Sequence, residues 1–204
     1  DTTKPMTLRQ LWVASPTGCV GMLLMGGVFS AQFGMSAVYG SLAGLSVTQI
    51  STFVAVIYIG GLLLQYPIGW LSDRMDRRKL IMYTAAAGCV SSLIGAAFGG
   101  QFLVLLVAAF LIGGLANPLY ALLIAYTNDY LEYEDMAAAS GGMVFINGVG
   151  AIAGPLIVGW LMGFAGPRGF WIYLAALMLA LSVYSLWRMT QRPSKSIDDT
   201  ASYT

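Results

Sequence analysis

The sequence contains no histidine, only two cysteines and very few charged side chains. Charged residues make up 9% of the 204 residues, whereas soluble domains contain about 25%. Without histidine, the chain lacks the commonest general base and the commonest imidazole metal ligand. The two cysteines, Cys19 and Cys89, lie in apolar segments and are interpreted as small buried side chains. We therefore expect a membrane protein with no metal site, no cofactor and no enzymatic activity.

The few charges are clustered, which leaves long segments without any. Residues 10–72, 80–128, 136–167 and 169–187 carry no charged side chain. Because about 20 apolar residues cross a bilayer as a helix, the first two segments hold two spans each and the last two hold one each. The sequence therefore predicts an all-α integral membrane protein with six transmembrane helices and the lipid bilayer as its partner. A net charge of +1 without a basic stripe makes a nucleic-acid partner unexpected.

Turn and cap signals place the six spans along the chain. The predicted spans are residues 15–40, 46–71, 79–98, 102–126, 136–164 and 169–188. The predicted domains are a leader at 1–14, the six-helix bundle at 15–188 and a polar tail at 189–204. Spans one to three and four to six have similar lengths, and three spans reverse the orientation of the next copy. This length argument predicts the inverted 3+3 repeat used by many secondary transporters.

The basic residues predict how the chain lies in the membrane, because lysine and arginine are enriched in cytoplasmic loops. Nine of the ten basic residues fall in the leader, in the link after span two and in the tail. The opposite side has Arg168 alone. We therefore expect a multi-pass protein of the cell membrane, the inner membrane in bacteria, with both termini cytoplasmic.

The link between spans two and three carries the most specific motif of the chain. Residues 69–79 read Gly-Trp-Leu-Ser-Asp-Arg-Met-Asp-Arg-Arg-Lys. This resembles the signature of the major facilitator superfamily, Gly-x-Leu-Ala-Asp-Arg-x-Gly-Arg-Arg-Lys, which lies after the second helix of a six-helix half. Asp76 departs from it by replacing the usual glycine. The matching residues are Gly69, Leu71, Asp73, Arg74, Arg77 and Arg78.

The resemblance implies a twelve-span transporter of which this chain supplies one six-helix half. The polar leader, the polar tail and the altered motif resemble the C-terminal half, so the leader would be a remnant of the central loop. The implied partner is an N-terminal six-helix half or a second copy of this chain. The implied function is secondary active transport of a small-molecule substrate by alternating access. The alternative is a membrane scaffold or assembly subunit that does not transport and uses the bundle only for packing.

The resemblance also implies a cytoplasmic gate around Asp73. In the family, the equivalent aspartate contacts a helix end of the opposite half when the cytoplasmic side is closed. The acidic link after span four emerges on the same side, so we expect Arg77 to reach Asp129 or Glu132. The alternative is that Arg74, Arg77, Arg78 and Lys79 act only as topological anchors.

Polar and aromatic side chains within the spans predict the substrate-facing surface, since lipid does not stabilise buried polar groups. Spacings of three and four residues group such side chains in spans one and four, and the family lines its central cavity with these two spans. The candidates are Phe29, Gln32, Phe33, Ser36, Tyr39, Asn117 and Tyr120. Second-rank candidates are Tyr58, Gly61, Gln65, Met143, Asn147 and Gly150. Each polar member has the alternative role of an interhelical hydrogen-bond partner.

Overall fold

The computed structural model describes residues 5–193 and 196–200. The rest of the predicted leader and tail, including Lys4 and Lys195, lies outside the described residues. The described residues form helices and no strands, and six helices are long and apolar enough to cross a membrane. The prediction of six spans is therefore confirmed. The spans are α2 (Pro16–Gly34), α4 (Val47–Ser72), α5 (Arg77–Phe98), α6 (Phe102–Asn128), α7 (Met136–Ala165) and α8 (Arg168–Met189).

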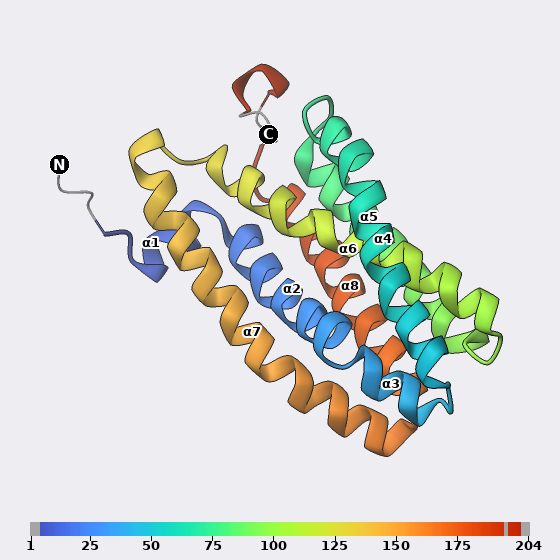
Figure 1. Cartoon of the computed structure of the whole chain (residues 1–204). Helices are drawn as coiled ribbons and strands as arrows, with labels where there is room; N and C mark the ends of the chain where they lie inside the picture. Colours follow the sequence, from blue (N-terminus) through green and yellow to red (C-terminus); the bar gives the residue numbers. More distant parts are fainter. Residues whose placement is uncertain (1–4, 194–195, 201–204) are drawn as a thin grey trace.

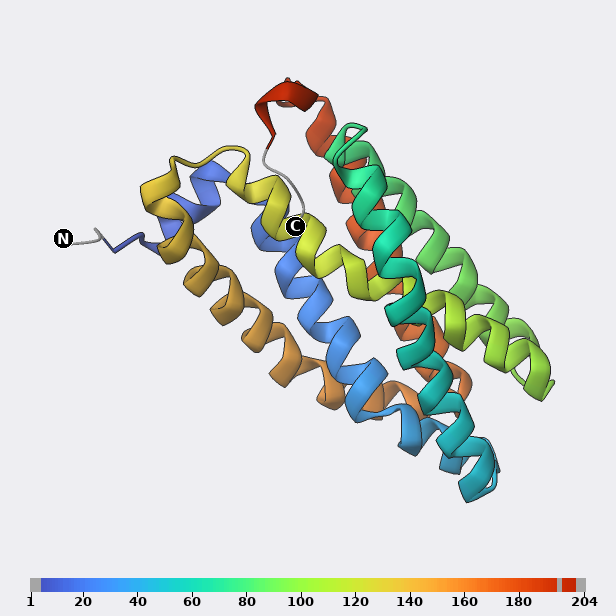
Figure 2. The ribbon, with the colours of Figure 1, turned by 45° about the horizontal axis from the view of Figure 1, so that its top comes forward.

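Within the described residues, four short helices accompany the spans: α1 (Leu8–Ala14), α3 (Ser36–Leu42), η1 (Tyr133–Asp135) and η2 (Ile197–Asp199). The first predicted span is divided, because the helix breaks at Met35 between α2 and α3. The α4–α5 turn and the α6–α7 link lie at the same end of the bundle as α1 and η2 (Figures 1 and 2). The α3–α4, α5–α6 and α7–α8 turns lie at the opposite end.

Local sequence signals explain where the spans begin. The Ser15 side chain accepts a hydrogen bond from the Gly18 N–H, and Pro16 occupies the first turn of α2, where its missing N–H costs nothing. Ser46 and Gln49 form the expected capping box at the start of α4. Gly166 ends α7 with a φ of 78°, a backbone conformation that favours glycine.

The spans pack as three close pairs, of which α2 with α7 is one. At Gly26, a Cβ atom would overlap the backbone carbonyl of Asn147, and at Gly150 it would overlap that of Leu23. The two backbones therefore touch without a layer of side chains between them. Small residues permit this approach in membrane helices, where packing rather than the hydrophobic effect drives association.

The pair formed by α4 and α6 is built in the same way. A Cβ atom at Gly60 would overlap the carbonyl of Phe110, and one at Gly113 would overlap that of Ile57. The third pair is α5 with α8. In an inverted repeat, spans one, two and three correspond to spans four, five and six. This correspondence relates the α2–α7 pair, which is spans one and five, to the α4–α6 pair, which is spans two and four. The pairing is thus the one that the expected inverted repeat would generate, and the repeat itself stays a prediction.

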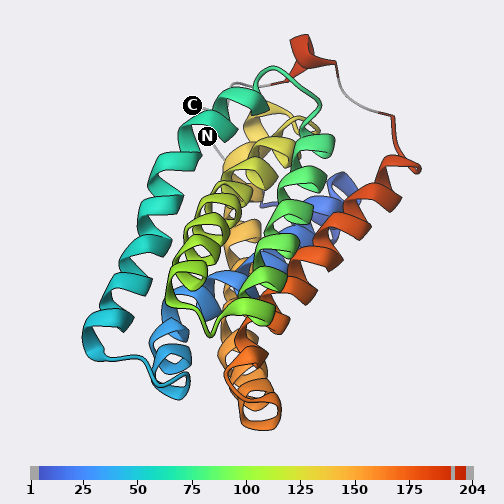
Figure 3. The ribbon, with the colours of Figure 1, turned by 90° about the vertical axis from the view of Figure 1, so that its right-hand side faces the viewer.

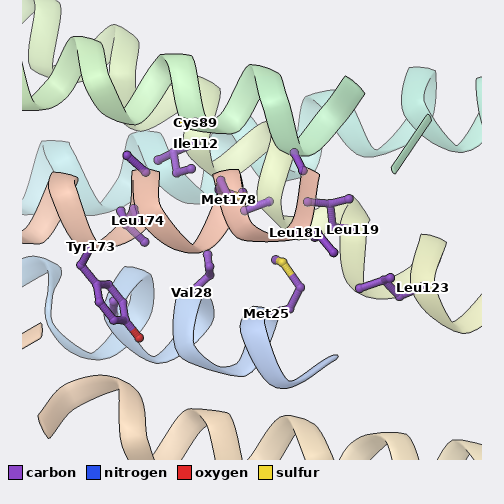
Figure 4. Packing of buried hydrophobic residues seen from close by; sticks show 14 of the residues in the cluster. Met25, Val28, Cys89, Ile112, Leu119, Leu123, Tyr173, Leu174, Met178 and Leu181 are labelled. Carbon is purple, nitrogen blue, oxygen red and sulfur yellow. The ribbon is translucent and has the colours of Figure 1, made fainter. Parts of the chain in front are cut away.

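The apolar core lies where α2, α5, α6 and α8 meet (Figure 4). Met25 and Val28 of α2 face Met178 and Leu181 of α8, and Leu119 of α6 lies beside them. These side chains are buried.

Tyr173 of α8 adds a polar contact at the edge of this core. Its hydroxyl donates to the Gly27 carbonyl of α2 at 2.9 Å. A Cβ atom at Gly154 of α7 would lie 3.0 Å from the same hydroxyl. Tyr173 therefore joins α8 to the α2–α7 pair.

The remaining faces differ in how much they are covered. Figure 3 shows α5 and α8 on one side of α6 and α4 on the other. Among the six spans, α4 and α7 are the least buried within the bundle. They leave apolar and aromatic side chains exposed along most of their length.

Candidate functional site: the signature link and the aromatic face

Arg77 is the centre of a buried polar cluster at the α4–α5 turn. Its Nη1 donates to both carboxylate oxygens of Asp129, at 2.7 and 2.8 Å. Its Nη2 lies 3.2 Å from Oδ1 of Asp73, and its Nε donates to the Ser72 hydroxyl at 3.0 Å. The Arg77 side chain is 2% exposed, Asp129 3% and Asp73 28%. A buried guanidinium therefore joins α4, α5 and the end of α6.

The helix ends explain why this charge is buried here. Asp73 caps the C-terminus of α4, and Asp129 caps that of α6. A helix C-terminus carries partial negative charge, so a carboxylate there is unfavourable unless a cation lies close. Arg77 supplies that cation, although it sits at the N-terminus of α5, where the helix dipole opposes it. The two carboxylates offset that opposition through charge-assisted hydrogen bonds.

The other basic residues of the link have different surroundings. The Arg74 guanidinium lies 4.1 Å from the centre of the Trp70 ring and donates to the Trp70 carbonyl. Arg78 pairs with Asp76, which caps the first turn of α5. Lys79 is exposed. Arg77 is the most buried of these four basic residues, since the Arg78 side chain is 12% exposed and Arg74 and Lys79 are exposed. The topological anchor role stays a prediction.

The tail residue Arg192 contacts the same end of the bundle. It donates to the Val13 and Ala14 carbonyls at the end of α1, and its guanidinium lies 4.5 Å from the Tyr130 ring centre. Its own carbonyl accepts a hydrogen bond from Arg78. Burial raises the pKa of Tyr130, and the nearby Arg78 and Arg192 only partly oppose this, so the phenol stays neutral. Sequence patterns gave no signal for these contacts.

An open groove of about 450 Å³ runs along α4 toward Asp73. Its lining residues belong to α4 and to the two residues that follow it, so a single helix and its C-terminal turn form the groove within the described residues. The lining residues are Leu62, Gln65, Tyr66, Gly69, Trp70, Asp73 and Arg74. The second-rank candidate Gln65 therefore lies in this groove.

A second feature is a row of aromatic rings that come from three of the spans. The Phe33 and Tyr58 ring centres are 4.9 Å apart. Phe29 lies 6.1 Å from Phe33 and 6.0 Å from Tyr120. We call these four residues of α2, α4 and α6 the aromatic row. Its side chains are partly or largely exposed.

An amide pair lies beside the aromatic row. Nε2 of Gln32 is 3.3 Å from Oδ1 of Asn117 and donates to it. Gln32 is fully buried, and its Oε1 has no hydrogen-bond partner among the described residues. Gly61 of α4 packs against the Asn117 amide. The structure thus brings together five of the seven first-rank candidates with second-rank Tyr58 and Gly61.

The expectation of a single face is wrong for Ser36 and Tyr39. Both are buried, and Tyr39 stacks on Phe170 with a centroid distance of 4.9 Å. Phe33 lies in α2 and is exposed, whereas Tyr39 lies in α3, beyond the helix break at Met35, so the spacing within one continuous helix does not relate them. The spacing argument therefore combined side chains from two neighbouring faces of the first predicted span. One of these faces lies toward the core and the other toward the open surface.

The candidates on α7 have structural contacts. Asn147 donates to the Met22 carbonyl of α2 at 3.0 Å. Met143 is buried, and Gly150 forms the close contact with α2 described above. Ser72 was missed as a site residue, although its position between Leu71 and Asp73 of the signature was a usable signal.

Comparisons with known proteins indicate the family to which the chain belongs. The family model described as Major Facilitator Superfamily matches residues 17–202. An uncharacterized MFS-type transporter of Enterobacter sp. (strain 638) is 23% identical over 180 residues, covering 87% of this chain and 45% of the relative. The uncharacterized MFS-type transporter YcaD of Escherichia coli O9:H4 (strain HS) is 26% identical over 163 residues, covering 78% of this chain and 40% of YcaD. The chain thus spans less than half the length of these relatives.

Two solved structures share the fold. The POT family transporter PepTSo superposes with a TM-score of 0.75 at 15% identity, covering 94% of this chain and 39% of that one. An auto inhibited POT family peptide transporter gives 0.72 at 16% identity, covering 90% and 37%. The six-span fold, the signature link and a family match over most of the chain lead to one conclusion: this chain belongs to the Major Facilitator Superfamily and is related to membrane transporters, not to enzymes.

Proposed function

We propose that the chain is one half of a secondary active transporter that moves a small solute by alternating access. Its partner would be another six-helix unit, either an N-terminal half or a second copy of this chain. The membrane would be the cell membrane, with both described ends of the chain on the cytoplasmic side.

The observation that carries this proposal is the asymmetry of the Arg77 cluster. Arg77 and Asp129 are buried within this chain, whereas the Asp73 carboxylate keeps 28% of its surface exposed in the α4 groove. A carboxylate next to an open groove is suited to accept hydrogen bonds from a helix N-terminus of another unit. Such a contact would hold the cytoplasmic side closed, and its rupture would open that side.

The groove also distinguishes transport from a scaffold role. In a scaffold, a permanent partner would cover α4, so the accessibility of the α4 groove would not change. In an alternating-access protein the same surface is reached from one side and then from the other.

The test uses a cysteine at Leu62, an exposed residue near the middle of α4, with Cys19 and Cys89 replaced. An impermeant maleimide is applied to right-side-out and to inside-out vesicles containing the chain and its partner unit. We expect labelling from both sides. Asp73→Asn should raise the cytoplasmic rate and lower the outside rate together.

Glu134→Gln provides the matched control, because Glu134 is an exposed acid at the same end of the bundle. It should leave both rates unchanged. Labelling from one side only, or rates that ignore Asp73→Asn, would support the scaffold interpretation.

A further inference from the structure

The aromatic row occupies the part of the bundle where a transported solute would bind. Tyr58 lies near the middle of α4 (Val47–Ser72), and the other members of the row lie within α2 and α6. Substrate sites of secondary transporters lie near the bilayer midplane. Tyr58 thus coincides in depth with the expected site, and the rest of the row and the amide pair adjoin it.

The exposure of Tyr58 indicates that this surface does not face lipid. The side chain is 55% exposed in the middle of a span. Polar groups at this depth face the protein interior or a water-filled cavity, because hydrocarbon offers no hydrogen-bond partner. The hydroxyl of Tyr58 therefore favours a cavity in front of the row.

The chemistry of this surface selects a class of solute. Four rings from three helices stand within 6.1 Å of their neighbours, so a planar aromatic solute can stack on them or meet their edges. The middles of the described spans contain no charged side chain. A charged solute would find no counter-ion on this surface.

Gln32 adds a preference for a solute that carries a hydrogen-bond donor. Its amide nitrogen is engaged by Asn117, but its buried Oε1 has no donor. A buried carbonyl oxygen without a donor is costly, so an N–H or O–H group is stabilised there. Asn117, the partner of the Gln32 amide nitrogen, is half-buried, so the amide pair borders the surface of the row.

From these observations we infer that the transported solute is a neutral, planar aromatic compound that carries an N–H or O–H donor. The rings of Phe29, Phe33, Tyr58 and Tyr120 stack with it, and Gln32 accepts its hydrogen bond. This inference rests on the proposed transport function and names the substrate class for it.

The test compares two probes of the same shape, indole and benzofuran, which differ in whether the ring carries an N–H donor. Binding to the chain reconstituted with its partner unit in lipid nanodiscs is measured by equilibrium dialysis, with empty nanodiscs as the blank. The partner unit is included because the cavity in front of the row would form between the two units. We expect indole to bind about two- to tenfold more tightly than benzofuran, the range for one neutral hydrogen bond.

Variants assign the preference to particular side chains. Gln32→Met keeps the length of the side chain and removes the carbonyl, so it should abolish the difference between the probes. Tyr58→Leu should weaken both probes about two- to tenfold by removing one ring contact. Tyr83→Leu is the control, since Tyr83 is an exposed tyrosine of α5 that lies outside both the row and the α4 groove.

The proposal is overturned if the unmodified chain binds both probes equally, an outcome that needs no variant to fold. It is also overturned if the preference persists in Gln32→Met or if Tyr83→Leu acts like Tyr58→Leu. Its failure is separable from that of the transport proposal. If the Leu62 labelling rates respond to Asp73→Asn while indole and benzofuran bind equally, transport stands and the substrate class is wrong. If indole binds more tightly while the labelling rates do not respond to Asp73→Asn, transport is refuted.

Discussion

Arg77 donates to both carboxylate oxygens of Asp129, and the two side chains are almost completely buried at the end of the bundle that carries the signature. They lie 52 residues apart in the sequence. Their contact fixes the first turn of α5 against the last turn of α6. The same arginine reaches Asp73 at the end of α4, so it contacts three of the spans or their ends.

Removal of Asp129 should destabilise the chain strongly. Asp129→Ala leaves a buried guanidinium short of one partner, which costs about 3 to 5 kcal/mol in comparable pairs. Thermal unfolding in detergent measures the loss. Glu132→Ala removes an exposed acid three residues away and should change stability by less than about 0.5 kcal/mol.

The double variant Arg77→Met with Asp129→Leu tests the cause of that loss. Replacing both members of a buried pair by apolar residues is often neutral or stabilising. We therefore expect it to be more stable than Asp129→Ala alone. If it is equally unstable, the ion pair is not the source of the effect.

Two glycines of α7 should respond differently to alanine. Gly150→Ala forces a Cβ atom against the Leu23 carbonyl, whereas nothing lies within 4 Å of a Cβ at Gly148. Gly150→Ala should lower the melting temperature, because the α2 and α7 backbones must separate. Gly148→Ala should leave it unchanged or raise it, since alanine favours a helix by up to about 1 kcal/mol. Equal effects would mean that the α2–α7 contact is looser than described.

The hydroxyl of Tyr173 should contribute modestly to stability. Tyr173→Phe removes the donor to the Gly27 carbonyl, and interhelical hydrogen bonds in membranes average about 0.6 kcal/mol and reach about 1.7. Tyr83→Phe is the control, because Tyr83 is exposed on α5. Denaturation of both variants in the same detergent gives the difference. A Tyr173 effect no larger than that of Tyr83 would contradict the prediction.

The orientation in the membrane can be measured directly. Cysteines placed at the exposed residues Ala43 and Glu134 lie at opposite ends of the bundle. An impermeant reagent applied to intact cells should label the Ala43 position and not the Glu134 position. Labelling of Glu134 alone would reverse the predicted orientation.

The six spans follow from the sequence because a bilayer imposes a length and excludes charge, and charge-free segments can be counted without knowing any contact. The break at Met35 could not be predicted in this way. Its backbone departs from helix for one residue only, and no proline marks the position.

The site could be predicted from the sequence where a side chain is charged and therefore needs a partner of opposite charge. Arg77 needed an acidic partner, and the geometry selects Asp129 because it caps α6, while Glu132 lies beyond the turn and is exposed. Tyr39 shows the limit of spacing arguments. Which of two adjacent stripes faces the core depends on the neighbouring helices, here Phe170 and Trp171 of α8.

The glycine contacts also determine how the bundle deforms. Where backbone meets backbone, as in the α2–α7 and α4–α6 pairs, there is no layer of rotatable side chains to accommodate sliding. The α2–α6 contact is different, because the Leu123 side chain packs onto Gly21 there. We therefore expect the α2–α7 pair and the α4–α6 pair each to move as a rigid two-helix unit. Deformation within the chain should be concentrated at the contact between α2 and α6.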